Sequence, residues 1–474
     1  MGNSIVKEST VAVTEDIVVE LQKENKEPVE QAKVVIVTGK ALQGVSLTTE
    51  TRSLTDETES LISGISDYDF APSFRCKSWN GKARYSDMIQ DGLRYLKKDT
   101  SNVVMLFESP STSAQDSSFY NGQVYKFHDW PPAPSASKGV LGPCRYSMMN
   151  GSSFPSFLRD GAPPAGLMEH WEAYVPGYVA PRFVAEIKDS DRVYAYLPVE
   201  SIENHVNDPH VHYHLVGKDA LPLMTQKTTK LLNSTKHRPC IAKTTHSMGS
   251  KGIFVIQNDE DEAEFNQFLQ ESGNPTFVIT EFVEIERNVA CHFFIHPNGE
   301  VTWIGSNENH RNAEGKFTSD SHLIMKDQDY LREIQLPFVK DVVAYCQSLG
   351  FWGFCGIDVL FDKNGKGHLV DLNPRVTGSC PSLMVAQLLR EKYGFEVGLF
   401  RRSGHISYFG SPEQLFKEVA EYNSAHEGVS QIVIFSVFER QPGLTSINIG
   451  VYGNDLDECM ATLNHFGHPK PADL

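Results

Sequence analysis

The chain has 474 residues, of which 40% are hydrophobic and 22% are charged, so it is long enough for two or three domains of ordinary globular composition. Its 43 basic and 60 acidic residues give a net charge of −17, which argues against a nucleic-acid binder or a protein held on anionic membranes. The 8 cysteines show no CxxC spacing and no apolar run approaches the ~18 residues of a membrane span, so we expect a cytoplasmic protein without disulfides or structural zinc.

The N-terminal part is expected to be a tail followed by an α/β domain. Residues 1–30 are polar and rich in Glu and Lys, which is typical of a flexible tail. The elements predicted after it are a buried strand at 34–37, a helix at 85–98 and strands at 103–107 and 192–197. Residues 108–180 are rich in Ser, Pro, Gly and aromatic residues, and the sequence does not reveal their role.

Residues 240–256 read as two short strands joined by a loop of small residues. The first strand, 240–243, ends in Lys243, and the second is 253–256. The loop at 244–252 offers backbone N–H groups that can fold over phosphates, and Lys243 supplies a positive charge. The spacing is not that of a P-loop. Taken alone, the segment fits an ordinary surface hairpin with a Gly-rich turn better than a nucleotide site.

Two further strands are followed by polar side chains. An apolar strand at 277–283 runs into Glu284, Glu286 and Arg287, and by itself it can be an ordinary strand that ends in solvated acids. A strand at 301–304 precedes a polar run at 306–312, which fits a loop that touches a substrate as well as it fits a plain surface loop.

Residues 350–379 predict a β-hairpin. Asn364-Gly365 lies between two apolar runs, which is the strongest short-range hairpin signal. With those two residues as the turn, Asp358 faces Asp371 on the side of the sheet that also carries Asn373. The opposite side is predicted to carry Ile357, Val359, Phe361, His368, Val370 and Leu372.

The facing acids suggest a cation site. Like charges opposite one another in a ladder repel, so Asp358 and Asp371 make sense if a divalent cation lies between them. Oxygen ligands of this kind suit magnesium, which takes its remaining ligands from water and substrate phosphates. Gly356, opposite Asn373, leaves room on the same face, and Arg375 is placed to bind phosphate oxygens. A polar sheet face exposed to water explains the same residues without a metal.

The segment GIDVLF–turn–HLVDLNPRVTGS resembles the metal-binding hairpin of the ATP-grasp ligases. Asp358, Asp371 and Asn373 match the family pattern of an acidic residue followed later by acidic-x-Asn. The order of the parts is also similar: lysine strand with Gly loop, strand near 281, then hairpin. The resemblance covers roughly 208–385, and the residue pattern is most similar to that of peptide and amino-acid ligases. It departs from the D-alanine–D-alanine ligases, which carry an arginine where this chain has Gly356.

The resemblance implies an α+β, ATP-grasp fold in which two α+β subdomains sandwich ATP, preceded by an α/β preATP-grasp domain. The implied domains are a flexible tail at 1–30, an N-terminal α/β domain at 31–207, a small lid subdomain at 208–285, a central subdomain with the metal hairpin at 286–400, and a C-terminal α+β extension at 401–474 of unassigned role. That extension is expected to be a small cap with a helix at 454–464 and strands at 431–438 and 445–451.

The resemblance also implies roles for single residues. Mg²⁺, or Mn²⁺, would be held by Asp358, Asp371 and Asn373, and the catalytic residues would be Arg375 and Lys243. ATP would be bound by Lys218, Lys243, Ser250, Gly252, Glu281, Phe282, Val283 and Glu286, the last on the ribose, with Glu284 as the other candidate for that contact. The turn at 377–379 offers donors for a substrate carboxylate.

The implied activity is that of an ATP-dependent carboxylate–amine ligase. It would form an amide or peptide bond through an acyl phosphate and release ADP and phosphate. Its substrates would be small-molecule carboxylates and amines of the amino-acid class, and a homodimer is compatible with the family. A small-molecule or carboxylate kinase would use the same nucleotide site. A non-catalytic ATP-binding protein is a third hypothesis, disfavoured because the acids, Asn373, Arg375 and Lys243 are all present.

Overall fold

The computed structural model divides the chain into two units, Met1–Val34 and Val35–Leu474, and every described residue belongs to the second unit. The residues that the structure describes are 36–40, 48–52, 74–111, 119–128, 138–247, 252–273, 275–311, 317–402 and 406–469. The predicted tail and Ser250 therefore lie outside the described residues. No helix in these described ranges combines the length and the apolar character that crossing a bilayer requires.

A small parallel sheet lies in the N-terminal part of the chain, in the order β6-β5-β4-β7. Its strands are β4 (Val103–Leu106), β5 (Ser156–Phe157), β6 (Phe183–Val184) and β7 (Arg192–Ala195), and the helices of this region are α2 (Tyr85–Tyr95), α3 (Lys138–Ser147) and α4 (Leu167–Tyr174). The helix and the strands predicted at 103–107 and 192–197 are present as α2, β4 and β7, but the strand predicted at 34–37 is not part of this sheet. The helix predicted at 85–98 ends earlier, at Tyr95, because only its first three turns carry buried apolar side chains such as Ile89 and Leu93.

The strand predicted at 34–37 is displaced. Strand β1 (Ile36–Lys40) begins and ends later than predicted and pairs antiparallel with β2 (Thr48–Arg52).

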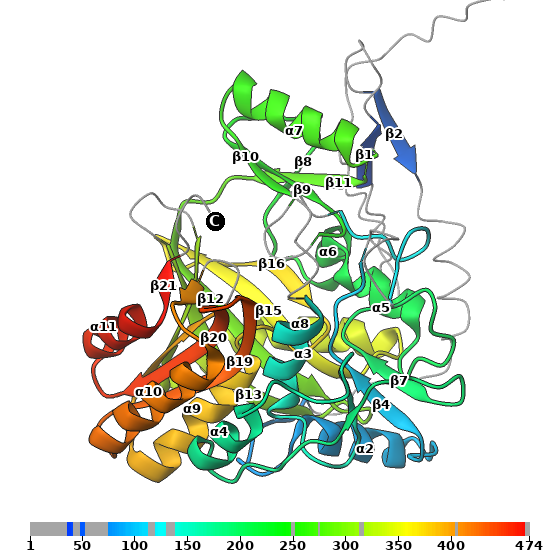
Figure 1. Cartoon of the computed structure of the whole chain (residues 1–474). Helices are drawn as coiled ribbons and strands as arrows, with labels where there is room; N and C mark the ends of the chain where they lie inside the picture. The colour runs from blue at the N-terminus through cyan, green and yellow to red at the C-terminus, as the bar shows by residue number, and fades with distance from the viewer. Residues whose placement is uncertain are drawn as a thin grey trace, which may run out of the picture. The chain divides into compact units, whose positions relative to one another are not determined.

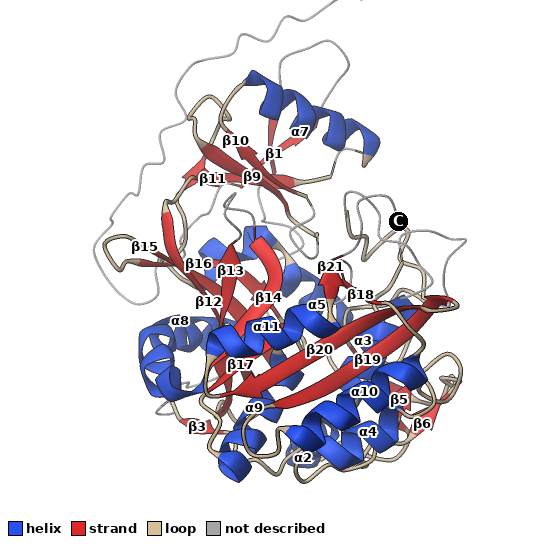
Figure 2. Cartoon of the chain, turned by 60° about the vertical axis from the view of Figure 1, so that its left-hand side comes forward, coloured by secondary structure: helices blue, strands red, loops and turns tan. Residues whose placement is uncertain are grey.

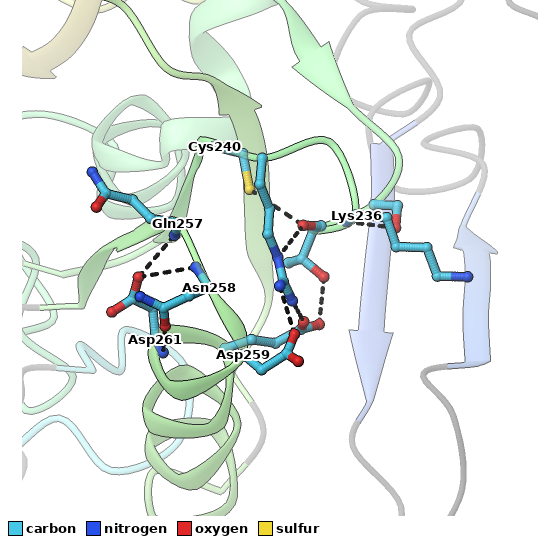
Figure 3. A network of polar contacts seen from close by, with 10 residues as sticks. Lys236, Cys240, Gln257, Asn258, Asp259 and Asp261 are labelled. Atoms are coloured by element: carbon cyan, nitrogen blue, oxygen red, sulfur yellow. Dashed lines mark hydrogen bonds and ion pairs between the residues drawn. The ribbon is translucent and has the colours of Figure 1, made fainter.

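A second sheet, antiparallel throughout, has the order β10-β9-β11-β8. Its elements are β8 (Leu231–Leu232), β9 (Cys240–Thr244), β10 (Ile253–Ile256), α7 (Asp259–Glu271) and β11 (Phe277–Glu281). Helix α7 lies on one face of this sheet, which we call the lid sheet (Figure 2), where its Phe265 and Phe268 pack on Ala242. A capping box begins α7 (Figure 3). The side chain of Asn258 accepts a hydrogen bond from Asp261 N, and the Asp261 carboxylate accepts one from Asn258 N.

The largest sheet has the order β16-β15-β12-β13-β14-β17-β20-β18-β21, with β19 paired to β20 and β3 to β13 (Figure 1 and Figure 2). Its strands are β3 (Cys76–Ser78), β12 (Ile285–Ile295), β13 (Val301–Arg311), β14 (Phe317–Ile324), β15 (Gly353–Asp362), β16 (Gly367–Asn373), β17 (Val397–Arg401), β18 (Ile406–Tyr408), β19 (Gln431–Gln441), β20 (Leu444–Gly453) and β21 (His468–Pro469). Helices α8 (Gln328–Ser348) and α9 (Cys380–Tyr393) pack against it. The hairpin β15–β16 stands at one end of this sheet.

The C-terminal elements extend this large sheet and do not form a separate cap. The predicted strands and helix are present as β19, β20 and α11 (Leu456–Phe466), and α10 (Pro412–Ala425) precedes them. Strand β20 pairs antiparallel with β17, however, so the hydrogen bonding runs on from the central strands. The order of elements in the sequence did not reveal this pairing, since the partner strand lies about fifty residues earlier.

Candidate active site

The predicted hairpin is present and brings the two acids together. In the ladder between β15 and β16, Asp358 lies opposite Asp371 and Gly356 lies opposite Asn373. The partly buried side chains of Asp358, Asp371 and Asn373 share one face, while Ile357 and its apolar neighbours enter the core on the other. The pairing predicted from the sequence is confirmed.

The prediction of a two-residue turn is wrong. The N–H of Asp362 donates to Lys366 O at 3.0 Å, and Phe361 pairs with Gly367, so the connecting loop is one residue longer than predicted. A β-bulge between Asp358 and Val359 restores the register farther down the hairpin. Because the bulge falls at Val370, Leu369 is the side chain that enters the core beside Val359, and Val370 is left partly exposed.

The facing carboxylates of Asp358 and Asp371 repel each other. Burial, together with the charge of Asp371, raises the pKa of Asp358. Asp371 is held by Lys218, whose Nζ lies 2.5 Å from Asp371 Oδ1, and by Asn373 Nδ2 at 3.3 Å from Oδ2. Asn309 Nδ2 lies 3.4 Å from Asp358 Oδ1. A cation bound to the oxygen atoms on this face would therefore offset the repulsion between the two carboxylates.

Lys218 is placed by a short run of helices. The helix start predicted at Asp208-Pro209 is confirmed: Asp208 caps α5 (Pro209–Val216) by accepting from His210 N and Val211 N. A 3₁₀ turn, η1 (Lys218–Ala220), and α6 (Leu221–Met224) follow. The backbone N–H of Lys218 donates to Thr245 O at 3.0 Å, which ties this turn to the end of β9. The Lys218 side chain is thereby buried and directed at the hairpin.

Lys243 reaches the same place from the lid sheet. It lies on β9, is 8% exposed, and makes no ion pair with any described residue. Burial lowers its pKa to about 8; the neighbouring charge of Asp371 opposes that shift, and that of Lys218 adds to it. A small hollow between the lid sheet and the hairpin is lined by Lys218, Leu221, Pro222, Thr228, Thr229, Leu231, Lys243, Val278, Thr280 and Leu369. Two cationic side chains thus line a hollow beside two carboxylates, as a phosphate chain with its cation would require.

Gly252 closes the loop that follows Lys243. Thr244 N donates to Gly252 O at 2.9 Å, and Gly252 has φ +80°, a conformation that a side chain would strain. A Cβ at Gly252 would lie 2.3 Å from Thr244 Oγ1. The glycine is therefore required by the close return of the chain, whatever the loop binds.

The strand proposed for the adenine edge ends at Glu281. Glu281 N donates to Lys230 O at 2.9 Å and its carboxylate accepts from Lys230 N at 3.0 Å, so the N–H of Glu281 is not available to a base. Phe282 and Val283 follow β11, half-buried. Glu284 is ion-paired with Lys363 at 3.2 Å, whereas Glu286 is exposed and has no ion pair among the described residues, which favours Glu286 for the ribose.

The polar run predicted as a loop at 306–312 is part of strand β13 up to Arg311. Polar residues are tolerated in this interior strand because they face the site: Asn307 Nδ2 donates to Asn309 Oδ1 at 3.0 Å, and Asn309 contacts Asp358. Asn309 is a site residue that the sequence indicated only as a member of this polar run.

Gly356 serves a purpose other than the predicted one. A Cβ at this position would lie 2.5 Å from Thr377 Cγ2, so the space is already filled by the turn at 377–379. Thr377 Oγ1 lies 2.5 Å from His292 Nδ1, and Ser379 Oγ donates to Asn307 Oδ1 at 2.8 Å. Burial lowers the pKa of His292 to about 4, so the imidazole is neutral near pH 7. The missing side chain of Gly356 lets the turn dock against the acidic face.

Arg375 lies at the rim of this face. Its guanidinium donates to Asn373 Oδ1 at 2.7 Å and to the hydroxyl of Tyr196 at 2.5 Å, and it stacks over the Tyr196 ring at 4.6 Å. These contacts fix the plane of the guanidinium beside the proposed metal ligands. Tyr196, on the N-terminal sheet side, carried no sequence signal, because only the fold brings it to the hairpin.

The donor set fits a magnesium ion that is completed by nucleotide. Within the described ranges no group of three or more His, Cys, Asp or Glu side chains could hold a metal by itself. Two aspartates and one amide oxygen are the incomplete, oxygen-only set expected where phosphates and water supply the other ligands. A larger hollow of about 440 Å³ lies elsewhere, lined by Ser78, Trp303 and residues of α8 and α9, and none of the predicted site residues lines it.

Comparison with known families identifies the class. Residues 223–373 match the family model described as L-aspartate--L-methionine ligase, ATP grasp. The match confirms the predicted ATP-grasp fold of the α+β class, and with it an ATP-dependent carboxylate–amine ligase. The matched range contains Lys243, the lid sheet and the whole hairpin as far as Asn373, whereas Lys218 lies just before it.

Solved structures show distant likenesses. N5-carboxyaminoimidazole synthetase from Staphylococcus aureus, complexed with ADP, is 13% identical, covers 77% of this chain and 96% of its own, and has a TM-score of 0.46. L-amino acid ligase from Bacillus licheniformis is 14% identical, covers 56% of this chain and 75% of its own, and has a TM-score of 0.38. No curated protein sequence matches the chain.

Proposed function

We propose that the protein joins the carboxylate of one amino acid, or a similar small molecule, to the amine of another through an acyl phosphate, and releases ADP and phosphate. The observation that carries this proposal is the facing pair Asp358 and Asp371, next to a hollow that is lined by Lys218 and Lys243, with Lys218 in contact with Asp371. The family match over 223–373 supports it. The two amino acids in that family's description, L-aspartate and L-methionine, are the first substrates to test.

We propose that Mg²⁺, or Mn²⁺, is held by Asp358, Asp371 and Asn373. When bound, the cation neutralises the β- and γ-phosphates during phosphoryl transfer. Lys218, which is paired with Asp371 in the ligand-free chain, would release that carboxylate to the cation and turn to a phosphate oxygen. Lys243 makes no ion pair with an acid in the described part of the chain, and it supplies the second positive charge to the phosphates.

The remaining residues position the reactants. The carbonyl of Glu281 and the backbone at Phe282 and Val283 would bind the adenine edge, and Glu286 the ribose. Arg375, held rigid by Asn373 and Tyr196, would stabilise the charge on the acyl phosphate and on the tetrahedral oxyanion. The loop closed by Gly252, which includes Ser250, would cover the phosphates. We also propose an N-terminal domain at 31–207, a lid subdomain at 208–285 and a central subdomain at 286–400, whose large sheet continues into 401–474.

No covalent protein nucleophile is required for this reaction. All 8 cysteines are free, and seven of them are buried, which also supports the proposed cytoplasmic, reducing location. A kinase that stops at phosphoryl transfer would use the same nucleotide site and is the rival to be excluded.

The test is ADP release with amino acids offered singly and in pairs, with the product identified by mass spectrometry. We expect release to require two partners, to require Mg²⁺, and to yield a product whose mass is the sum of both partners less one water. The Asp358→Asn protein is the matched inactive control. ADP release with a single acid, together with a stable phosphorylated product, would instead establish a kinase.

A further inference from the structure

Three arginines from distant parts of the chain gather beside the acidic face. Arg145 lies on α3, Arg375 follows β16, and Arg402 follows β17. We call them the arginine cluster. The charges of Arg375 and Arg402 both act on Asp358, and the charge of Arg145 acts on Arg402. The three cations therefore lie within one electrostatic neighbourhood at the site.

Two tyrosines tie the cluster together. The hydroxyl of Tyr196 accepts from Arg375 and lies 3.2 Å from the hydroxyl of Tyr146, which in turn accepts from Arg145 Nη2 at 2.8 Å. Arg145 stacks over the ring of Tyr146 at 4.5 Å. This chain of contacts holds Arg145 in a fixed orientation toward the hairpin, although α3 itself lies against β19 and β20 (Figure 2).

The cluster lacks acidic partners. Among the described residues, no Asp or Glu oxygen lies within 4.0 Å of a nitrogen of Arg145, Arg375 or Arg402. By contrast, the preceding residue, Arg401, donates from Nε and Nη2 to the two carboxylate oxygens of Asp320, at 2.6 and 2.7 Å. The Nε atoms of Arg145 and Arg375 are buried and have no hydrogen-bond partner in the described part of the chain. Buried donors and like charges without an anion are costly, so their persistence indicates an anion that the chain itself does not supply.

Arg402 also reaches the turn after the hairpin. A Cβ on Gly378 would lie 2.7 Å from Arg402 Nη1 and 2.8 Å from its Cδ, so the guanidinium rests directly on this glycine. The adjacent Ser379 begins α9 but makes no side-chain cap to the helix, because its hydroxyl is used by Asn307 and His292. Arg402 is solvent-exposed, so a small anion can reach it.

We propose that Arg145 and Arg402 form an anion subsite for a substrate carboxylate that is not phosphorylated. This inference rests on the proposed ligase function, in which Arg375 alone serves the reacting carboxylate. The planar fork of arginine suits a carboxylate held by two donors. The carboxylate has two sources: a second acid group on the substrate that is activated, or the carboxylate of the amino acid that supplies the amine. All three arginines lie outside the matched range 223–373, so substrate selection is carried by the part of the chain that the family model leaves unmatched.

The kinetic test uses Arg145→Gln, Arg402→Gln and the control Arg182→Gln. Arg182 is likewise exposed and bonded only to backbone carbonyls, so its substitution removes the same charge away from the site. We expect both cluster variants to raise the KM of one substrate about 10–100-fold, with the KM of ATP unchanged, since each loses charge-assisted hydrogen bonds. Arg402→Lys, which keeps the charge, is expected to recover part of the loss.

The arms of this test identify the source of the carboxylate. If the KM of the acid rises, and the wild type discriminates against an analogue without its second acid group by a similar factor, the subsite binds a dicarboxylate. If the KM of the amine rises, and its carboxamide is discriminated against instead, the subsite binds the carboxylate of the amine partner. Unchanged KM values for both substrates in both variants would overturn the subsite.

A binding test separates this proposal from the ligase proposal. Calorimetry with L-aspartate alone, in the absence of ATP, should show binding to the wild type and to Arg182→Gln, and at least about tenfold weaker binding to Arg145→Gln and Arg402→Gln. Such a result upholds the subsite even where no ligation product is found. Equal binding of L-aspartate to all four proteins would refute it, and the unfolding temperature of each ligand-free variant verifies its fold.

Discussion

Replacing Lys243 by methionine should have opposite effects on folding and on nucleotide binding. The side chain is almost wholly buried, carries no ion pair with a described residue, and has its pKa lowered from 10.5 to about 8 by that burial. Since one pKa unit corresponds to about 1.4 kcal/mol, holding the charged form in the ligand-free protein costs on the order of 3 kcal/mol. Methionine fills a similar volume without the charge.

The sign of this effect depends on pH. Because the pKa in the folded chain is below that in the unfolded chain, the cost is full below about pH 8 and disappears as pH rises to about 10.5. We therefore expect ligand-free Lys243→Met to be more stable than the wild type by about 1–3 kcal/mol near pH 7, with the difference shrinking above about pH 8.

Nucleotide binding should respond in the reverse direction. The loss of a charge-assisted contact to phosphate is worth about 1.5–3 kcal/mol, so Mg·ADP should bind Lys243→Met about 10–100-fold more weakly. Urea unfolding at several pH values and calorimetry with Mg·ADP measure the two effects. Lys236→Met is the matched control, because Lys236 is exposed in the same lid (Figure 3). A Lys243→Met protein that is less stable than the wild type, or that binds Mg·ADP equally well, would refute the assigned role.

Two further predictions concern stability. His170 Nε2 accepts from Ile434 N at 2.8 Å, and burial lowers the pKa of His170 to about 3, so the chain loses stability as pH falls below about 6.5. At about pH 5 this loss is about 2 kcal/mol. Urea titrations should find a smaller loss in His170→Gln, and an unchanged loss would contradict the assignment. Gly356→Ala should destabilise the folded chain by about 1–3 kcal/mol, because the added methyl group clashes with Thr377 Cγ2. Adding Thr377→Ser, which removes Cγ2 but keeps the hydroxyl, should relieve this loss. Equal unfolding temperatures for the single and double variants would rule out this clash.

The β15–β16 hairpin shows how much of the site could be predicted from the sequence. The opposition of Asp358 and Asp371 was predicted correctly, but by two errors that cancel. The loop at Asn364 is one residue longer than the two-residue turn, and a bulge at Val370 takes up the extra residue. Leu369 and Val370 are both apolar, so the alternation pattern alone could not show which one enters the core.

The parts that the sequence did not show are those made by long-range contact. Asn309 could be suspected from its polar run, but its place in a strand depends on pairing with β12 and β14. Arg145 and Arg402 lie more than two hundred residues apart, and nothing near either residue distinguishes it from a surface arginine. Only the packing of α3 and β17 around the hairpin brings them together.

The central claim is that Asp358 and Asp371 tolerate each other because a cation joins them to ATP. Its most direct test is the Mg²⁺ dependence of ATP binding to Asp371→Asn, measured by calorimetry with Mg²⁺ and with a chelator. Asp362→Asn, which removes the same charge at the turn of the same hairpin, is the control. We expect Mg²⁺ to tighten ATP binding about tenfold or more in the wild type and in the control, and to have little effect in Asp371→Asn. The same Mg²⁺ enhancement in all three proteins would contradict the assignment.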